Sequence, residues 1–362
     1  MATNFYPRCL PVLIGSLPLY DHVEGVKLVF EYTPEIPLWV QLPAYKEEGM
    51  IAQFQPGLPG LKLEKDKSFI DTSDPRFDDE LLEFYEDYMA VKEGGTDLEN
   101  SRFILDIATA KGFFSFKEQL QALPDRQVAV KGQITGPVTF GLGLTDQNGK
   151  AIFYNRQLRD AAVKLLAQKA RWQVKNLAGF GCPVIIFFDE PALAGFGSSA
   201  FITISRNEVL NCFEEVIEAV HDEGGLAGIH VCANADWSLL LESGTDIISF
   251  DAYSFFDKLI LYPDLVKRFI QSGGILAWGI IPTLNNEDIE KETTDSLVAT
   301  WEKQALAIQA IGIDKSAILD QTLITPSCGT GSLSLDHAKK VLVLTRQVSD
   351  IIRKKNYSLY LS

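Results

Sequence analysis

Short apolar segments rich in β-forming residues alternate with longer helical patterns along the whole chain of 362 residues. Alternation of this kind is typical of a parallel sheet whose strands are connected by helices. Eight such segments are present: Leu10–Ile14, Leu38–Leu42, Val128–Ile134, Val184–Phe188, Leu226–Val231, Ile247–Phe250, Ile275–Ile281 and Ala317–Ile324. Eight strands alternating with helices predict an α/β fold, a (β/α)8 TIM barrel, for which about 250 residues is a typical length.

The residues in excess of that length fall mainly between the second and third strands, at Pro43–Gln127. We therefore expect a helical insertion there. Apolar residues three and four positions apart predict helices over Asp79–Val91, Arg156–Leu177, Asp295–Ile311 and Leu335–Arg353, and the capping box Ser205-Arg-Asn-Glu208 predicts the start of another.

The domain organisation follows from what the chain lacks. It contains no linker, internal repeat or low-complexity tract, so we expect one domain over residues 1–362. The alternative, an open doubly wound sheet, normally has a glycine-rich phosphate-binding loop after its first strand. The corresponding sequence, Gly15-Ser-Leu-Pro, is not such a loop.

The charge of the chain limits its partners and its location. Lys and Arg number 33 against 48 Asp and Glu, giving a net charge of −15, so the basic footprint of nucleic-acid binders is absent. We expect no nucleic-acid and no membrane partner, because no apolar stretch approaches the ~18 residues of a membrane helix. The N-terminus does not resemble a signal peptide, and the five scattered cysteines do not suggest a disulfide framework, so we expect a cytoplasmic protein.

Polar residues follow five of the predicted strands. Because the active site of a (β/α)8 barrel lies at the carboxyl ends of its strands, these residues should meet at one rim. They are Gly15-Ser16, Asp189-Glu190-Pro191, His230-Val-Cys232, Asp251 and Cys328-Gly329.

His230 and Cys232 lie two positions apart on one strand, so their side chains share a face, roughly 6–7 Å apart along it. With Asp251 and Cys328 they offer one nitrogen, two sulfurs and one oxygen, a set that favours zinc over magnesium or calcium. The alternative is a chance His-x-Cys pair in which Cys232 is a small buried hydrophobe.

The ligand types also indicate what the metal does. Two thiolates and a carboxylate around Zn²⁺ leave a centre of net charge −1, which activates water poorly, whereas zinc hydrolases use neutral-rich sets. Such a centre still deprotonates a coordinated thiol and leaves its sulfur nucleophilic. We therefore expect alkylation of a substrate thiol.

Carboxylates near the same rim are candidates for binding a substrate ammonium. Asp189 is the strongest, while Glu190 serves equally well as a cap of the helix that starts near Pro191. Glu48, beyond the second strand, is a weaker candidate. Gly15 and Ser16 offer N–H groups and a hydroxyl suited to a carboxylate, although a simple turn explains them equally well.

These motifs resemble the C-terminal catalytic barrel of cobalamin-independent methionine synthase, in the uroporphyrinogen decarboxylase-like superfamily. The resemblance spans nearly the whole chain, through Ile14-Gly-Ser16, Gln41-Leu-Pro43, Gly136-Pro-Val138, Asp189-Glu-Pro-Ala-Leu193, His230-Val-Cys232, Asp246-Ile-Ile-Ser-Phe-Asp251 and Pro326-Ser-Cys328-Gly329. It implies a zinc-dependent methyltransferase that acts on homocysteine. It assigns the metal to His230, Cys232, Asp251 and Cys328, and the substrate to Asp189, Ser16 and Glu48.

Three departures from that family concern the metal and the methyl donor. Asp251 stands where the family has glutamate, and Trp278-Gly-Ile-Ile-Pro-Thr283 lacks the family's histidine after strand seven. We also expect no second, N-terminal barrel of the kind that the long enzymes of the family carry. Methyltetrahydrofolate requires a general acid at its leaving nitrogen, whereas a methylcorrinoid leaves as reduced cobalt without a proton. We therefore expect methylcobalamin, free or on a corrinoid methyl-carrier protein, as the donor.

Other functions remain open at this stage. A methylcobamide methyltransferase acting on coenzyme M or another small thiol also uses a His-x-Cys pair and a later cysteine. A metal-free decarboxylase of the uroporphyrinogen decarboxylase type needs an arginine-rich cleft, which the strand ends do not supply. A non-catalytic zinc-binding barrel would hold its metal in a closed four-ligand site.

Overall fold

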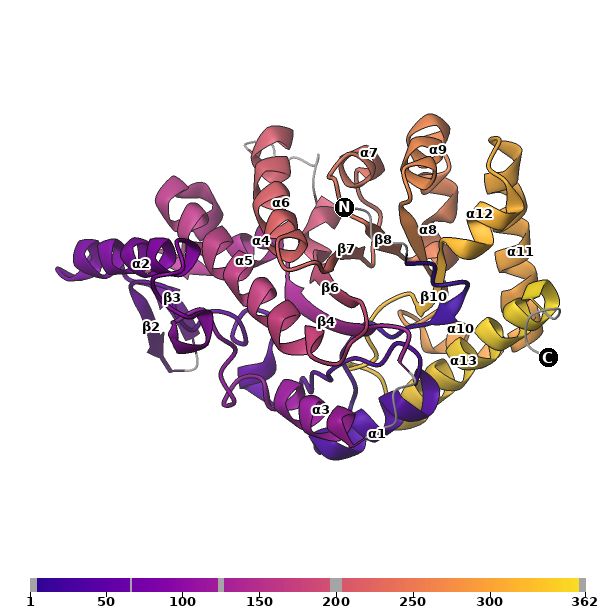
Figure 1. The fold of residues 1–362 in the computed structure, drawn as a ribbon, viewed down its shortest axis with the longest axis horizontal. Coiled ribbons are helices and arrows are strands. Elements are labelled where there is room, and N and C mark those ends of the chain that lie inside the picture. The colour runs from indigo at the N-terminus through magenta and orange to yellow at the C-terminus, as the bar shows by residue number, and fades with distance from the viewer. Residues whose placement is uncertain (1–4, 66, 123–126, 196–203, 358–362) are drawn as a thin grey trace.

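A computed structural model describes residues 5–65, 67–122, 127–195 and 204–357 of the chain (Figure 1). Its centre is a curled parallel sheet of seven strands with helices packed around it. In spatial order the strands are β1 (Leu10–Pro11), β10 (Thr322–Pro326), β9 (Ile275–Ile281), β8 (Ile247–Phe250), β7 (Leu226–Val231), β6 (Val184–Asp189) and β4 (Val130–Thr135).

The sheet is of TIM-barrel type but has seven strands in the described chain where the sequence predicts eight. Residues 38–42 do not form a regular strand. They make isolated parallel bridges, from Leu38 to Lys131 of β4 and from Gln41 to Ser16. Pro37 and Pro43 flank this segment, and proline cannot donate the N–H group that a regular ladder needs.

The last strand also differs from the prediction of Ala317–Ile324. Residues Lys315–Asp320 form helix α12, and β10 starts only at Thr322. Ile318 and Leu319 are buried from the helix. A short apolar run that is buried on a helix cannot be distinguished from a strand by its periodicity, which explains the error.

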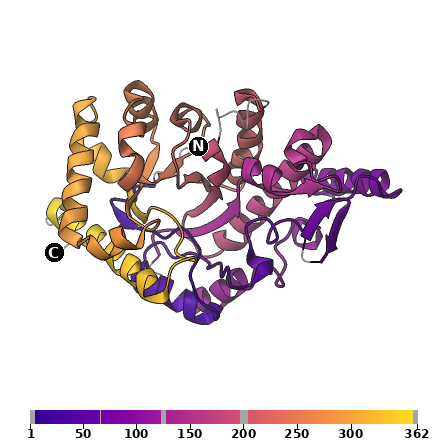
Figure 2. The same cartoon turned by 180° about the vertical axis from the view of Figure 1, so that it is seen from behind.

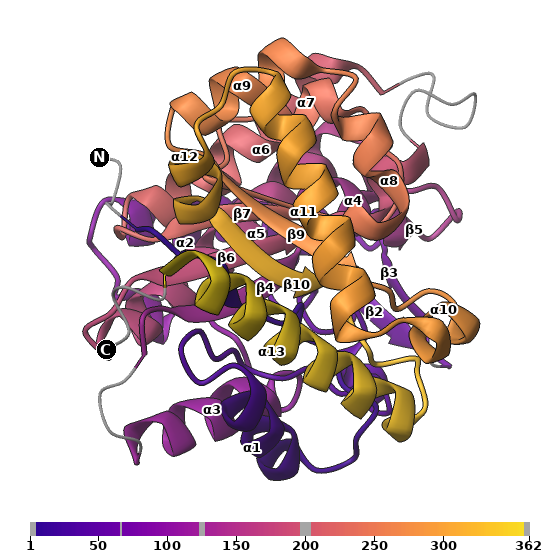
Figure 3. The same ribbon diagram turned by 90° about the vertical axis from the view of Figure 1, so that its right-hand side faces the viewer.

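The predicted helices are present with small shifts of their ends. They are α2 (Phe77–Lys92), α5 (Arg156–Ala178), α6 (Arg206–His221), α11 (Thr294–Ala310) and α13 (Leu335–Tyr357). The capping box is confirmed, because the Ser205 side chain accepts from Glu208 N–H and the Glu208 carboxylate accepts from Ser205 N–H. In Figure 3, α13 crosses beside β10 and α11, and it packs against both.

The insertion after residue 43 is helical, as expected, but it also contains a hairpin. Strands β2 (Leu61–Glu64) and β3 (Lys67–Ile70) pair antiparallel, and β3 pairs with β5 (Thr145–Asp146) in a separate three-stranded sheet. This hairpin lies beside α2 at one end of the molecule, as both faces show (Figures 1 and 2). Helix α3 (Lys111–Gln121) instead packs on α1 (His22–Tyr32).

The remaining described helices are short and mostly follow strands. They are α4 (Pro137–Gly143), α7 (Trp237–Leu241), α8 (Ala252–Leu259), α9 (Pro263–Gln271) and α10 (Asn286–Lys291). The strands are buried along almost their whole length, as expected of a parallel sheet covered by helices. Among the described helices, none combines the length and the apolar character that crossing a membrane requires.

Candidate metal and thiol-binding site

The strand register places several polar residues at one level of the sheet. Asp189 of β6 pairs with Thr135 of β4 on one side and with His230 of β7 on the other. His230 pairs in turn with Ser249 of β8. Parallel strands therefore bring residues more than a hundred positions apart into one row at the carboxyl end.

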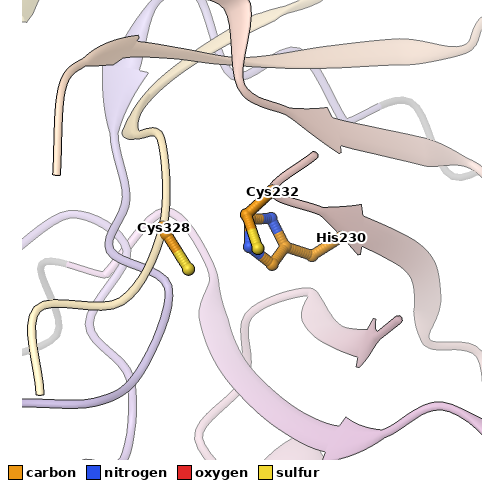
Figure 4. A group of neighbouring side chains, drawn as sticks. All are labelled: His230, Cys232 and Cys328. Carbon is orange, nitrogen blue, oxygen red and sulfur yellow. The ribbon is translucent and has the colours of Figure 1, made fainter. Parts of the chain in front are cut away.

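Three of the predicted metal ligands meet at this rim. One candidate ligand atom each of His230, Cys232 and Cys328 lies within 4.8 Å of the others, and Figure 4 shows Cys328 facing the pair from across the site. His230 and Cys232 come from the end of β7, and Cys328 from the loop after β10. The three side chains are thus close enough to share one ion.

The two thiols differ in acidity. The neighbouring Cys328 thiol and His230 imidazole lower the pKa of Cys232 to about 4, against the opposing effect of burial. The proximity of Cys232, together with burial, raises the pKa of Cys328. At Cys212, by contrast, burial and nearby carboxylates raise the pKa to about 12, so the low pKa of Cys232 is specific to this cluster.

The environment of His230 fits a metal ligand. Its Nδ1 lies 2.9 Å from the hydroxyl of Ser249, while its Nε2 is buried and has no hydrogen-bond partner. A metal-bound imidazole commonly uses its second nitrogen in such a bond, which fixes the ring orientation. With the sulfurs of Cys232 and Cys328 beside it, the imidazole of His230 completes a donor set that suits zinc.

Asp251 lies outside the three-residue group. It is the N-cap of α8, where its Oδ1 accepts a hydrogen bond of 2.8 Å from Ser254 N–H. Its Oδ2 is buried without a partner. Burial raises the pKa of Asp251 to about 6, and the charges of Cys232 and His230 also act on it, so it is close to the cluster.

A cavity of about 380 Å³ opens beside the cluster. The residues that line it include six of the predicted site residues. These are Ser16, Glu48, Asp189, His230, Cys232 and Cys328. Gly15, Glu190 and Asp251 are not among its lining residues.

Asp189 has an unpartnered carboxylate oxygen and lines this cavity. Its Oδ1 is buried without a hydrogen-bond partner, and burial raises its pKa to about 6. Lys131 is fully buried, and its charge acts to lower the pKa of Asp189. Its Nζ donates a hydrogen bond of 2.5 Å to the carbonyl of Ile14. Burial lowers the pKa of Lys131 to about 7.

Glu190, the next residue, faces away from the cavity. Its two carboxylate oxygens accept hydrogen bonds from the N–H groups of Val138 and Thr139 at 2.9 and 2.8 Å, and from the Thr139 hydroxyl. These groups belong to the first turn of α4, which leaves its N–H groups without intrahelical partners. Glu190 therefore caps α4, and burial raises its pKa to about 7.

Ser16 binds the loop after β10, whereas the Gly15 carbonyl accepts a hydrogen bond of 3.1 Å from Gln41 N–H. Ser16 accepts a hydrogen bond from Gly331 N–H at its hydroxyl, and bonds from Thr330 N–H and Oγ1 at its carbonyl. A Cβ atom at Gly329 would overlap the Ser16 hydroxyl, so only glycine fits this close approach. The contact fixes the loop that carries Cys328.

His22 has no ligand-spaced partner in the sequence, so no motif there marks it as a functional residue. In the structure, His22 Nε2 lies 2.6 Å from Glu48 Oε1, and Leu42 N–H donates to Glu48 Oε2 at 2.8 Å. The pair is separated by 26 residues, so no local pattern indicates it.

The fold and the cluster together define an α/β barrel-type protein with a thiol and imidazole site at the carboxyl ends of its strands. No family model matches the chain, and no curated protein sequence matches it. Among solved structures, a B12-independent methionine synthase from Shewanella sp. W3-18-1, in complex with selenomethionine, is similar at 15% identity with a TM-score of 0.56. The alignment covers 97% of this chain and 99% of that chain, which supports a related fold.

Two further structures are similar at lower TM-scores. A GH20 catalytic module of the pneumococcal exo-β-D-N-acetylglucosaminidase StrH aligns at 9% identity and TM-score 0.44, over 95% of this chain and 85% of that chain. An A. niger ochratoxinase aligns at 11% identity and TM-score 0.28, over 68% of this chain and 67% of that chain.

Proposed function

We propose that this protein is a zinc-dependent methyltransferase that methylates the thiol of homocysteine to form methionine. The observation that carries the proposal is the cluster of His230, Cys232 and Cys328 at a cavity that also contains two carboxylates, Asp189 and Glu48. The similarity of the fold to a methionine synthase supports a methyltransferase.

The number of clustered ligands supports a catalytic zinc. Catalytic zinc sites commonly have three protein ligands and keep a fourth position for water or substrate, whereas structural sites are closed by four. The chain brings three side chains together, and Asp251 lies outside the group. Zinc bound there supplies a Lewis acid that keeps the thiol of a substrate in its nucleophilic, deprotonated form.

The residues around the cavity select the acceptor. Asp189 binds the ammonium of the amino acid through its unpartnered Oδ1, which orients the thiol toward the cluster. Among the described residues that line the cavity, none is lysine or arginine. This favours an ammonium-bearing thiol over coenzyme M, whose sulfonate needs a cationic partner, and it disfavours the decarboxylation of a polycarboxylate.

The donor we propose is methylcobalamin, free or on a corrinoid protein. At the end of β9 the described chain carries Thr283, whose hydroxyl lies 2.9 Å from that of Ser327, and no histidine that could protonate a folate nitrogen. The methyl group then moves to sulfur as the cobalt–carbon bond breaks, and the electron pair of that bond stays on cobalt. The similar Shewanella protein is described as B12-independent, so the donor needs its own assay.

The test is metal analysis of the purified protein followed by a methyl-transfer assay. Methylcobalamin and methyltetrahydrofolate are compared as donors, and homocysteine and coenzyme M as acceptors. We expect stoichiometric zinc, and methionine formed from methylcobalamin and homocysteine. Full activity without metal would refute the zinc mechanism, and methionine formed only from methyltetrahydrofolate would refute the donor.

A further inference from the structure

His22, His221 and His337 each pair with a carboxylate through Nε2. The partners are Glu48 at 2.6 Å, Asp246 at 2.7 Å and Glu290 at 3.0 Å, respectively. Of the three carboxylates, only Glu48 lines the cavity beside the metal cluster. The first pair is also the most buried, with side-chain exposures of 10% for His22 and 3% for Glu48.

Protein groups hold both oxygens of Glu48. His22 binds Oε1, and the backbone N–H of Leu42 binds Oε2. His22 is itself fixed, because its ring stacks on Tyr45 with centroids 5.4 Å apart, and Tyr45 Oη donates to the carbonyl of Tyr20. These contacts connect the start of α1 to the short 3₁₀ turn Lys46–Glu48.

The two carboxylates of the cavity therefore differ in how they are held. Asp189 sits on a strand end, where the sheet fixes its backbone and its Oδ1 has no partner. Glu48 sits on a 3₁₀ turn and has a longer side chain, so its position depends on its hydrogen bonds. A carboxylate oxygen has room for a second donor beside the first, so the bond from His22 leaves Glu48 able to accept one from a substrate ammonium.

We propose that His22 is a positioning residue for substrate binding: it holds Glu48 in the orientation in which that carboxylate and Asp189 together grip the ammonium of the amino-acid substrate. This role rests on the proposed function, because it requires a substrate with an ammonium group. It predicts that the loss of His22 weakens recognition of the ammonium and leaves the metal cluster intact.

The experiment measures binding by calorimetry with two probes. L-Methionine carries the ammonium and carboxylate of the proposed product, and 4-(methylthio)butanoate lacks only the ammonium. We expect His22→Ala to bind L-methionine about tenfold more weakly than the unmodified protein, the effect of losing one charge-assisted hydrogen bond. Affinity for 4-(methylthio)butanoate and the zinc content should not change, and in the transfer assay KM for homocysteine should rise while kcat is retained.

Two variants serve as controls. His22→Gln keeps an N–H donor and should recover most of the affinity. His337→Ala removes a histidine–glutamate pair that is not part of the cavity lining and should bind as the unmodified protein does. If His22→Ala and the unmodified protein bind L-methionine equally, the positioning role of His22 is wrong, while the proposed function is unaffected. If the unmodified protein binds neither probe, the proposed substrate class is wrong and the role of His22 falls with it.

Discussion

The two ends of the parallel sheet satisfy their polar groups to different degrees. At the amino end, Asp246 Oδ2 accepts hydrogen bonds from His221 Nε2 at 2.7 Å and from Ala227 N–H at 2.8 Å. Gln321, just before β10, donates to two backbone carbonyls at 2.7 and 2.8 Å.

At the carboxyl end, by contrast, Asp189 Oδ1, His230 Nε2 and Asp251 Oδ2 are buried and have no partner within the protein. A buried polar group without a hydrogen bond costs about 1–3 kcal/mol. Three ionisable side chains bear this cost together at the rim where barrels of this type carry their active sites. The polar groups at the amino end therefore stabilise the fold, whereas those at the carboxyl end are free to bind a ligand.

The largest effect should come from removing a metal ligand. Cys328→Ala should lose zinc and reduce methyl transfer more than about hundredfold, because even hydrogen-bond partners of metal ligands contribute ~10–100-fold. Metal analysis and the transfer assay measure this. Cys182→Ala changes a cysteine that precedes β6 at the amino end, and it should keep both zinc and activity. Equal zinc content in the two variants would contradict the proposed cluster.

Substitutions at the adjacent residues Asp189 and Glu190 should have different effects, the first on substrate binding and the second on stability. Asp189→Asn should raise KM for homocysteine by about 10–100-fold through the loss of a charge-assisted bond to the ammonium. Glu190→Gln removes one acceptor from the first turn of α4 and should lower the free energy of unfolding by about 1–3 kcal/mol. Steady-state kinetics and urea unfolding distinguish them. A KM effect at Glu190 equal to that at Asp189 would contradict this division.

A smaller effect should follow from loosening a ligand. Ser249→Ala removes the hydroxyl beside His230 Nδ1 and should weaken zinc binding by about tenfold, measured by competition with a chelator. Thr325→Val is the matched control, because the Thr325 hydroxyl is also buried in the sheet but has no hydrogen-bond partner. If both variants bind zinc like the unmodified protein, Ser249 does not orient His230.

The sequence predicts the fold best where strands are long and buried. β7, β8 and β9 match their predicted ranges, since continuous apolar runs between turns indicate buried parallel strands. Prediction fails in the proline-rich part of the chain. Residues 38–42 are apolar like a strand, but they form isolated bridges and not a regular hydrogen-bonding ladder. It also fails around Ala317, because a short apolar run looks the same in the sequence whether it is buried on a helix or on a strand.

The site was predictable to the extent that strand ends define it. His230, Cys232 and Cys328 come together because parallel strands end at one rim, which topology alone implies. The orientations of the Asp251 and Glu190 side chains were less predictable, because both lie at the start of a helix. There an acidic side chain can bind backbone N–H groups instead of a ligand. No sequence pattern indicates His22, because its contact with Glu48 joins the start of α1 to a 3₁₀ turn, and no sequence spacing encodes that packing.

The smallest effect concerns the amino end and its pH dependence. The hydrogen bond with Asp246 is the main cause that raises the pKa of His221. Because the folded-state pKa lies above the unfolded one, the stabilisation is fully present below the unfolded pKa and is lost as pH rises through the folded pKa. The His221 side chain is 40% exposed, so solvent screens the pair and the effect should stay below about 1 kcal/mol.

His221→Gln should therefore be less stable than the unmodified protein at pH 5, and the difference in the free energy of unfolding should shrink as the pH rises toward 9. Urea unfolding at several pH values measures this difference. Zinc content and methyl transfer should stay unchanged, because His221 lies at the end of the sheet away from the cluster. A difference that grows with pH contradicts the sign of the shift, and a loss of zinc contradicts the separation of the two ends.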